Sequence, residues 1–280
     1  MTQTSEKPAK KTAPATNGKR RALVTGASAG IGEEFARQLA AKGYDLILVA
    51  RRKERLDQLA ADVTEKAGVA VEVLPADLST PEGVAVAENR IARGDIDLLV
   101  NNAGFATLGV FGSLPLEREQ EELDVNIRAL VSLTHAALGP MLQCGQGTII
   151  NLGSVGSFTP TPYMATYVAT KAFVLHFSES VHEEVRDRGV TVTCLCPGFV
   201  ASEFQGVAGL DVSELPSAGW QTPKQVVAAA LKGAAARRAI VIPGAMNSVM
   251  ASAPRFTPRF LVRRIAGSIF KKNATKETTG

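Results

Sequence analysis

With 280 residues, the chain is long enough to bury one large α/β core, and its 45% hydrophobic and 21% charged residues are ordinary for a soluble globular protein. No apolar run reaches the ~18 residues of a membrane-spanning helix, and no apolar leader begins the chain, so we expect a cytoplasmic protein. The net charge of +4 hides an acidic middle, because residues 22–254 carry 18 basic and 25 acidic residues. An acidic body argues against binding to nucleic acid.

Residues 1–20 are rich in Lys, Thr, Ala and Pro, which predicts a disordered basic tail. After them, β-rich runs alternate with amphipathic stretches. The expected strands are Ala22–Thr25, Asp45–Ala50, Ala70–Pro75, Leu98–Asn101, Thr148–Leu152, Val190–Cys196 and Ala239–Ile242. The expected helices are Ile31–Lys42, Lys53–Lys66, Pro81–Arg93, Leu116–Gln143, Tyr163–Arg188 and Pro223–Arg237. This alternation predicts an α/β fold over residues 21–253, a doubly wound parallel sheet of about seven strands (a Rossmann fold) with helices on both faces.

Three glycines follow the first expected strand and open the first expected helix. Gly26, Gly30 and Gly32 are spaced G-x-x-x-G-x-G, which differs from the commoner G-x-G-x-x-G. Glycine permits positive φ and lets backbone N–H groups approach a pyrophosphate. The dipole of the helix that starts at Ile31 favours the same anion. This loop predicts a dinucleotide site, and the alternative is an ordinary strand-to-helix turn.

The end of the second strand indicates which dinucleotide binds. An NAD enzyme usually places an acidic residue about 20 residues beyond the glycines, near position 50. Here Ala50 is followed by Arg51 and Arg52. A carboxylate would repel a 2′-phosphate, whereas a guanidinium binds it. We therefore expect NADP(H) rather than NAD(H), with Arg51 as the main contact and Ser28 or Arg52 assisting. The alternative is that both arginines are solvated residues at a helix start.

Two further segments follow the third and fourth strands. Asp77, followed by Leu78, is placed to accept a hydrogen bond from the adenine amino group, or else to cap the helix that begins at Pro81. Asn102, Ala103 and Gly104 are small enough for a flat ring to lie against the backbone, although such a segment also forms ordinary turns.

Tyr167 and Lys171 are spaced i and i+4, so they share one face of the expected helix. An ammonium beside a phenol favours the phenolate, and we expect it to lower the pKa of Tyr167. The pair resembles an acid–base group poised over a bound nucleotide.

Taken in order, these motifs make the chain similar to the short-chain dehydrogenase/reductase family over residues 21–245, and most like bacterial NADP-type reductases. The matching features are the glycine loop, Asn102–Gly104 with the preceding Asn101, Asn126, Ser154, the Tyr167/Lys171 pair, and Pro197, Gly198, Phe199 and Val200. Two positions depart from the usual pattern. Ser202 stands where the family often has Thr, and it can still offer a hydroxyl to the nicotinamide carboxamide. Gly153 stands where many relatives carry a second serine.

The resemblance implies catalysis by Asn126, Ser154, Tyr167 and Lys171. Tyr167 would exchange a proton with the substrate oxygen, and Ser154 would orient that oxygen. Lys171 would tune the phenol and bind the nicotinamide ribose, and Asn126 would help to hold a proton-relaying water; a helix-packing role is its alternative. The family often forms homodimers or homotetramers through the helices that bear Asn126 and Tyr167.

The substrate is expected to be a lipophilic ketone, aldehyde or 3-oxoacyl thioester, because the residues expected around the pocket are apolar. They are Phe105, Phe111, Phe158, Tyr163, Phe199 and Phe204. Residues 203–222 are glycine-rich and predict a mobile lid. Two other functions are open, an alcohol or hydroxysteroid dehydrogenase working oxidatively and a non-catalytic NADP(H)-sensing regulator.

Residues 254–280 form a basic C-terminal segment. Within 254–272 apolar and basic residues alternate in an amphipathic pattern, which is consistent with lying on an anionic membrane. The alternative is a helix that packs on the pocket or on a neighbouring subunit. Cys194 and Cys196 are expected to be reduced core residues on one face of a strand, and neither the cysteines nor the three histidines have metal-ligand spacing.

Overall fold

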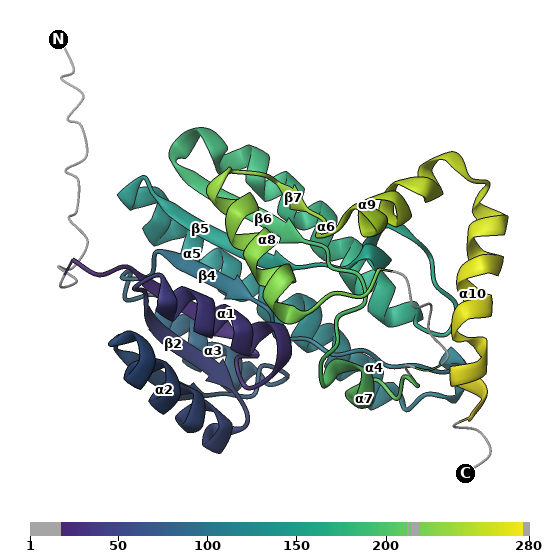
Figure 1. The fold of residues 1–280 in the computed structure, drawn as a ribbon, viewed down its shortest axis with the longest axis horizontal. Helices are drawn as coiled ribbons and strands as arrows, with labels where there is room; N and C mark the ends of the chain where they lie inside the picture. Colours follow the sequence, from purple (N-terminus) through teal and green to yellow (C-terminus); the bar gives the residue numbers. More distant parts are fainter. Residues whose placement is uncertain (1–17, 212, 214–218, 277–280) are drawn as a thin grey trace, which may run out of the picture.

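The computed structural model describes residues 18–211, 213 and 219–276. Most of the predicted tail, part of the predicted lid and the last four residues of the chain lie outside these ranges. The strands are β1 (Arg21–Thr25), β2 (Asp45–Ala50), β3 (Val71–Pro75), β4 (Leu98–Asn101), β5 (Gly147–Leu152), β6 (Val190–Leu195) and β7 (Ile240–Val241). They form one sheet in the order β3-β2-β1-β4-β5-β6-β7, and every neighbouring pair is parallel (Figure 1).

The sheet is covered on both faces, as the alternation in the sequence predicts. One face packs under α1 (Gly30–Ala41), α2 (Lys53–Ala67) and α8 (Pro223–Ala235), with Phe35, Leu56 and Val226 fully buried in the core between them. The other face packs under α3 (Pro81–Ile91), α5 (Leu130–Cys144) and α6 (Ala165–Val185), whose buried residues include Ile91, Leu133 and Val181. The predicted doubly wound fold is therefore confirmed, and its strand ends lie within one residue of the expected ones.

The prediction of one continuous helix between the fourth and fifth strands is wrong. The sequence predicts a single helix over Leu116–Gln143, but the structure has α4 (Leu116–Leu123), a π-helical turn η2 (Asp124–Ala129) and then α5. A π-turn inserts a residue into the helix and commonly marks a functional position. Here the turn carries Asn126 inward, where its side chain bonds to the backbone of Phe105.

The remaining elements are short or C-terminal. They are η1 (Phe111–Ser113), η3 (Val155–Phe158), η4 (Arg186–Arg188), α7 (Phe204–Val207), α9 (Ala245–Ser252), η6 (Ala253–Phe256) and α10 (Arg259–Lys276). Figure 1 shows α9 and α10 beyond the sheet, at the end where α4 and α7 also lie. Among the described residues, no helix combines the length and apolarity needed to cross a bilayer.

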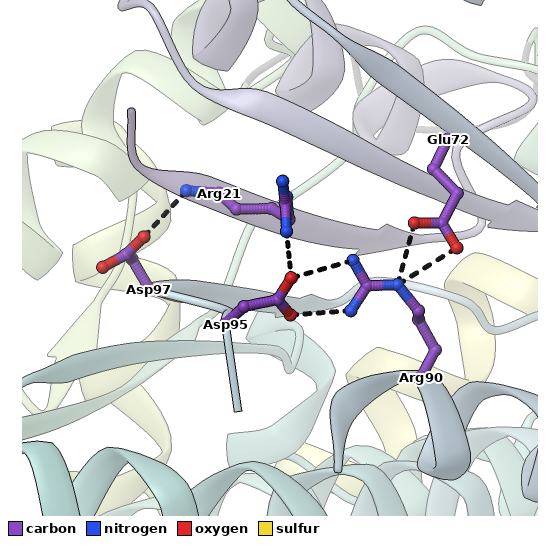
Figure 2. A network of polar contacts seen from close by, with 5 residues as sticks. All are labelled: Arg21, Glu72, Arg90, Asp95 and Asp97. Carbon is purple, nitrogen blue, oxygen red and sulfur yellow. Dashed lines mark hydrogen bonds and ion pairs between the residues drawn. The ribbon is translucent and has the colours of Figure 1, made fainter. Parts of the chain in front are cut away.

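A network of ion pairs joins β1, β3 and the segment before β4, at the amino end of the sheet (Figure 2). Arg90, whose side chain is only 4% exposed, binds Glu72 at 2.8 Å and Asp95 at 2.7 Å. Asp95 also pairs with Arg21, whose backbone N–H donates to Asp97 at 2.7 Å. Burial raises the pKa of Asp95, but the hydrogen bonds and charges of Arg90, with the charge of Arg21, outweigh it and hold that pKa below the usual value. The network thus ties together the amino ends of these strands, on the side of the sheet opposite their carboxyl ends.

Candidate active site

A cavity of about 710 Å³ opens at the carboxyl edge of the sheet, among the segments that follow strands β1 to β6. A doubly wound fold binds ligands at this edge. The cavity is lined by Gly26, Ser28, Gly30, Ile31, Arg51, Arg52, Asp77, Leu78, Asn102, Ala103, Gly104, Ser154, Tyr167, Lys171, Pro197, Gly198, Val200 and Ser202. Two other residues predicted for the site, Gly32 and Asn126, do not line the cavity. Gly32 lies in the first turn of α1, and Asn126 packs against Gly104.

The glycine turn is shaped to receive an anion. Gly26 and Gly30 have φ of +64° and +58°, a region that favours glycine. A Cβ on Gly26 would lie 2.9 Å from the Cα of Ala103, so the turn also needs glycine for space. No side chain caps the N-terminus of α1 at Ala29, which leaves its first N–H groups for a ligand in the cavity. These features fit the pyrophosphate of a dinucleotide.

Thr25, at the end of β1, fixes the neighbouring loop, and sequence reasoning missed it. Its hydroxyl donates to the carbonyl of Val100 at 3.2 Å and accepts from the N–H groups of Asn102 (2.9 Å) and Ala103 (3.0 Å). The glycine turn and the Asn102–Gly104 segment are thereby held together. A threonine directly before the first glycine is the sequence signal that could have identified it.

The two arginines after β2 lie at the cavity edge with acidic neighbours. Arg52 donates to the Ser28 hydroxyl at 3.1 and 3.2 Å and pairs with Glu203 at 3.0 Å. Arg51 is more exposed and is 3.5 Å from Glu121 and 3.8 Å from Asp77. Exposed pairs of this kind are weak and exchange readily for a stronger anion such as a phosphate.

Asp77 is not a helix cap. The backbone N–H and hydroxyl of Ser79 donate to its carboxylate at 3.0 and 2.8 Å, whereas α3 is capped by the hydroxyl of Thr80, which accepts from Gly83 at 3.1 Å. The capping alternative is therefore wrong. Burial raises the pKa of Asp77, but the bonds from Ser79 and the charge of Arg51 hold it below the usual value. Asp77 lines the cavity as an ionised acceptor.

Ser154, Tyr167 and Lys171 meet at the floor of the cavity. The Ser154 hydroxyl bonds to the phenol of Tyr167 and also accepts from the N–H of Gly156 at 3.0 Å. Lys171 is buried; its Nζ donates to the carbonyl of Leu152 at 2.8 Å and lies 5.6 Å from the centroid of the Tyr167 ring.

The expectation that Lys171 lowers the pKa of Tyr167 is wrong for this structure. Burial raises the pKa of Tyr167 to about 12; the bond from Ser154 acts against this rise, and the charge of Glu122 adds to it. Burial also lowers the pKa of Lys171 to about 8. The lysine is weakened as a cation and faces the ring and a carbonyl. The phenol is therefore protonated at neutral pH, as a proton donor must be.

Asn126 holds the segment that follows β4. Its Oδ1 accepts from the N–H of Phe105 at 3.2 Å, and its Nδ2 donates to the carbonyl of Phe105 at 3.0 Å and to the hydroxyl of Thr170 at 3.1 Å. A Cβ on Gly104 would lie 2.7 Å from Asn126 Oδ1 and 3.5 Å from Lys171 Nζ. Asn126 thus lies directly behind the cavity wall, next to Lys171.

The outer part of the cavity is apolar, but only half of the expected aromatic residues line it. Phe105, Phe199 and Phe204 do, whereas Phe111, Phe158 and Tyr163 do not. Phe111 is 59% exposed, Phe158 packs against the β6 side of the core, and Tyr163 packs beside the cavity with φ of +71°. The wall is completed by residues that the sequence analysis did not select, namely Met164, Val168, Leu210, Met250, Val262, Ile265, Ala266, Ile269 and Phe270.

Helix α10 is therefore part of the site. Phe270 packs in one cluster with Ala106, Leu108 and Met164, and a Cβ on Gly267 would lie 3.1 Å from Pro162. This matches the alternative in which the C-terminal segment packs on the pocket. The apolar residues spaced through 254–272 were the sequence signal for this packing.

The prediction that Cys194 and Cys196 are core residues is confirmed. Cys194 and Cys196 are free and fully buried, and their sulfurs lie 3.6 Å apart on one face of the chain. Over the described ranges, the structure has no group of three or more His, Cys, Asp or Glu side chains that could hold a metal ion.

The chain is similar to known proteins along most of its length. A family model described as short chain dehydrogenase matches residues 20–211. A very-long-chain 3-oxoacyl-CoA reductase of Anas platyrhynchos is 34% identical over 218 residues, 75% of this chain and 67% of the duck protein. The reductase of the same name from Laccaria bicolor is 37% identical, and the match covers 66% of this chain but only 56% of that protein.

Solved structures agree with these matches. A short-chain dehydrogenase from Sphingobium yanoikuyae in complex with NADPH has 39% identity and a TM-score of 0.79, over 86% of this chain and 94% of the other. An alcohol dehydrogenase from Comamonas testosteroni described as specific for bulky-bulky ketones has 32% identity and a TM-score of 0.74, over 85% and 92% of the two chains. The chain belongs to the short-chain dehydrogenase/reductase family, whose members are oxidoreductases of alcohol and carbonyl groups.

Proposed function

We propose that this protein uses NADPH to reduce the carbonyl group of a lipophilic substrate, a ketone, an aldehyde or a 3-oxoacyl thioester. The observation that carries the proposal is a single cavity with Ser154, Tyr167 and Lys171 at its floor, the uncapped start of α1 on one side and an apolar wall on another. The names of the relatives, 3-oxoacyl-CoA reductase and bulky-ketone alcohol dehydrogenase, support the same substrate class.

Each catalytic residue has a role in this proposal. NADPH, when bound, supplies the hydride, and negative charge then builds on the substrate oxygen. Ser154 donates a hydrogen bond to that oxygen and orients it, and Tyr167 delivers the proton. Lys171 binds the nicotinamide ribose and stabilises the phenolate left behind, while Asn126 fixes the segment at Phe105 and helps to hold a proton-relaying water.

The function is tested by following NADPH consumption with a panel of medium- and long-chain aldehydes, ketones and 3-oxoacyl thioesters. We expect kcat/KM to rise with the length of the substrate's apolar chain, because each buried methylene contributes about 0.8 kcal/mol of binding free energy. A preference for short, hydrophilic carbonyl compounds would contradict the proposal.

We propose that NADP(H) is preferred over NAD(H). Arg51, Arg52 and Ser28 surround the cavity edge where β2 ends, and no acidic residue occupies position 50. Replacing Arg51 or Arg52 by Ala is expected to raise the KM for NADPH roughly tenfold or more, because each loses a charge-assisted bond to the 2′-phosphate. The KM for NADH should change little.

Arg55→Ala provides a matched control, because Arg55 pairs with the same Glu203 but does not line the cavity. It should leave the KM for both cofactors unchanged. A wild-type protein that uses NADH as well as or better than NADPH would rule out the preference.

We also propose that the surface of α9, η6 and α10 contacts an anionic membrane. Val249, Phe256, Phe260 and Ile265 are 55–88% exposed on this surface. The exposed Arg255, Arg259, Arg263 and Arg264 pair with no acidic residue in the part of the chain that the structure describes. Apolar side chains among unpaired cations suit the headgroup region of a bilayer. A lipophilic substrate would then reach the cavity from the lipid.

Replacing these four arginines by Gln is expected to abolish co-sedimentation with vesicles that contain phosphatidylserine and to leave turnover of a short substrate intact. The control replaces four exposed cations elsewhere by Gln, at Lys42, Arg188, Lys224 and Lys232. Equal co-sedimentation of both variants and the wild type would contradict membrane contact through this surface.

The domain bounds and the oligomeric state of the protein are proposed as well. The catalytic unit runs from residue 21 to residue 253, and residues between Pro254 and Phe270 complete its cavity. The protein would be a cytoplasmic homodimer or homotetramer that assembles through α5 and α6, where Phe173 is 41% exposed and stacks on Phe177. The molecular mass in dilute solution, measured by light scattering, distinguishes these states from a monomer.

A further inference from the structure

A pair of buried acidic residues lies next to the tyrosine–lysine pair. Glu122 is completely buried and Glu119 is 4% exposed, and both lie on α4 directly before the π-turn. Carboxyl groups are rarely buried at this level without a partner. Glu119 bonds to the hydroxyl of Thr166 on α6, and its other oxygen has no partner in the described structure.

Glu122 holds the loop that forms the inner wall of the cavity. Its Oε2 accepts from the N–H of Thr107 at 2.9 Å and from the hydroxyl of Thr107 at 2.8 Å. Its Oε1 lies 3.5 Å from Nδ2 of Asn126. Because Asn126 bonds to both the N–H and the carbonyl of Phe105, the two side chains together fix the segment from Phe105 to Thr107.

We propose that Glu122 is a positioning residue of the active site, which fixes the Phe105–Thr107 segment through hydrogen bonds and keeps Lys171 positively charged through its own negative charge. The proposal rests on the catalytic role of Lys171 given above. It adds a fifth group to the four residues that the sequence predicts.

The electrostatics of the site support this role. The titratable groups that act on Glu122 are Glu119 on the same helix and Lys171 on α6, and Glu122 in turn acts on Tyr167. Those that act on Lys171 are Cys194 on β6, then Glu122, and then Cys196 directly after β6. Lys171 is thus the cation coupled to Glu122. Above its pKa of about 7, Glu122 is ionised and supplies negative charge to the lysine.

Fold stability does not explain why the residue is an acid. Burial raises the pKa of Glu122 to about 7, although the bonds from Thr107 act against this. A carboxyl whose pKa is raised on folding binds its proton more tightly in the folded state. Stability therefore falls as the pH rises from the unfolded pKa toward 7, and the ionised group costs stability above that. A group that destabilises the fold beside a catalytic lysine is typical of a functional position.

The test is Glu122→Gln, which keeps an acceptor for Thr107 but removes the charge. The alkaline limb of the kcat/KM profile, where Lys171 loses its proton, is expected to move to lower pH by roughly one unit. At pH values above that limb, kcat/KM of the variant should be roughly tenfold lower than that of the wild type. The melting temperature at pH 8 should be unchanged or higher, because the buried charge is gone. A purely structural role would lower stability and leave the limb in place.

Asp124→Asn is the matched control, because it removes a carboxylate two residues away that pairs with the exposed Arg128. It should leave the pH profile unchanged. A second readout does not depend on turnover. The Cε methylene carbon of Lys171, assigned by its absence in Lys171→Met, reports the pKa of the lysine by NMR, and that pKa should be lower in Glu122→Gln.

The outcomes separate this proposal from the proposed function. An alkaline limb and a Lys171 titration identical to wild type in Glu122→Gln would overturn the role of Glu122, even in an active reductase. If no carbonyl compound is reduced, the proposed function fails, and the NMR titration still decides whether Glu122 sets the charge of Lys171.

Discussion

Replacing Tyr167 by Phe is expected to reduce kcat roughly a thousandfold and to change the NADPH dissociation constant less than about twofold. The change removes one oxygen, which is the proton donor to the substrate, and general acid catalysis of this kind contributes about 10²- to 10⁴-fold. The ring remains to pack against Phe204, whose centroid lies 5.7 Å away, so the cavity keeps its shape. Steady-state kinetics and fluorescence titration with NADPH measure the two quantities.

Tyr163→Phe is the control for this experiment. Tyr163 lies four residues upstream of Tyr167, is partly buried and does not line the cavity. Loss of its hydroxyl should leave kcat within about twofold of the wild-type value. Turnover near wild type in Tyr167→Phe, or an equal loss in both variants, would refute the assignment of Tyr167 as the proton donor.

Gly32→Ala is expected to weaken NADPH binding by roughly 100-fold. A Cβ at this position would lie 2.2 Å from the carbonyl oxygen of Gly26 and 2.5 Å from Nδ2 of Asn102. The first turn of α1 would have to move away from the glycine turn, which displaces the N–H groups proposed to bind the pyrophosphate. Overpacking of this kind costs about 1–3 kcal/mol, and 2.7 kcal/mol is a factor of about 100 in affinity.

The control substitution is Gly139→Ala on α5, where an added Cβ meets nothing within 4 Å. It should leave NADPH binding unchanged and stabilise the helix slightly, because Ala has the higher helix propensity. Circular dichroism at the assay temperature verifies that both variants are folded. If a folded Gly32→Ala variant binds NADPH as tightly as the wild type, the glycine turn is not the pyrophosphate site.

The fold was predictable because the signals for it are local. Strand β2 occupies the predicted residues Asp45–Ala50, since a buried parallel strand is a short apolar run between turn residues. The π-turn at Asn126 was not predictable, because local propensity there favours a continuous helix. What stabilises the turn is the bonding of Asn126 to Phe105 and Thr170, 21 and 44 residues away.

The same distinction applies to the site. The i, i+4 spacing placed Tyr167 and Lys171 on one helix face, but it could not give the direction of their pKa shifts. Spacing says nothing of how much water surrounds a side chain. Packing removes that water, which raises the pKa of Tyr167 to about 12 and lowers that of Lys171 to about 8.

By itself, the sequence determined the doubly wound sheet, the glycine turn, and the order of the candidate catalytic residues along the chain. Each of these depends on residue type and on spacing over a few residues. Only the tertiary structure decided that α10 walls the cavity, that Phe111 is exposed outside it, and that Glu122 is buried against Thr107 and Asn126. These three depend on contacts between segments far apart in the chain, such as Phe270 with Ala106, and on the water that those contacts exclude.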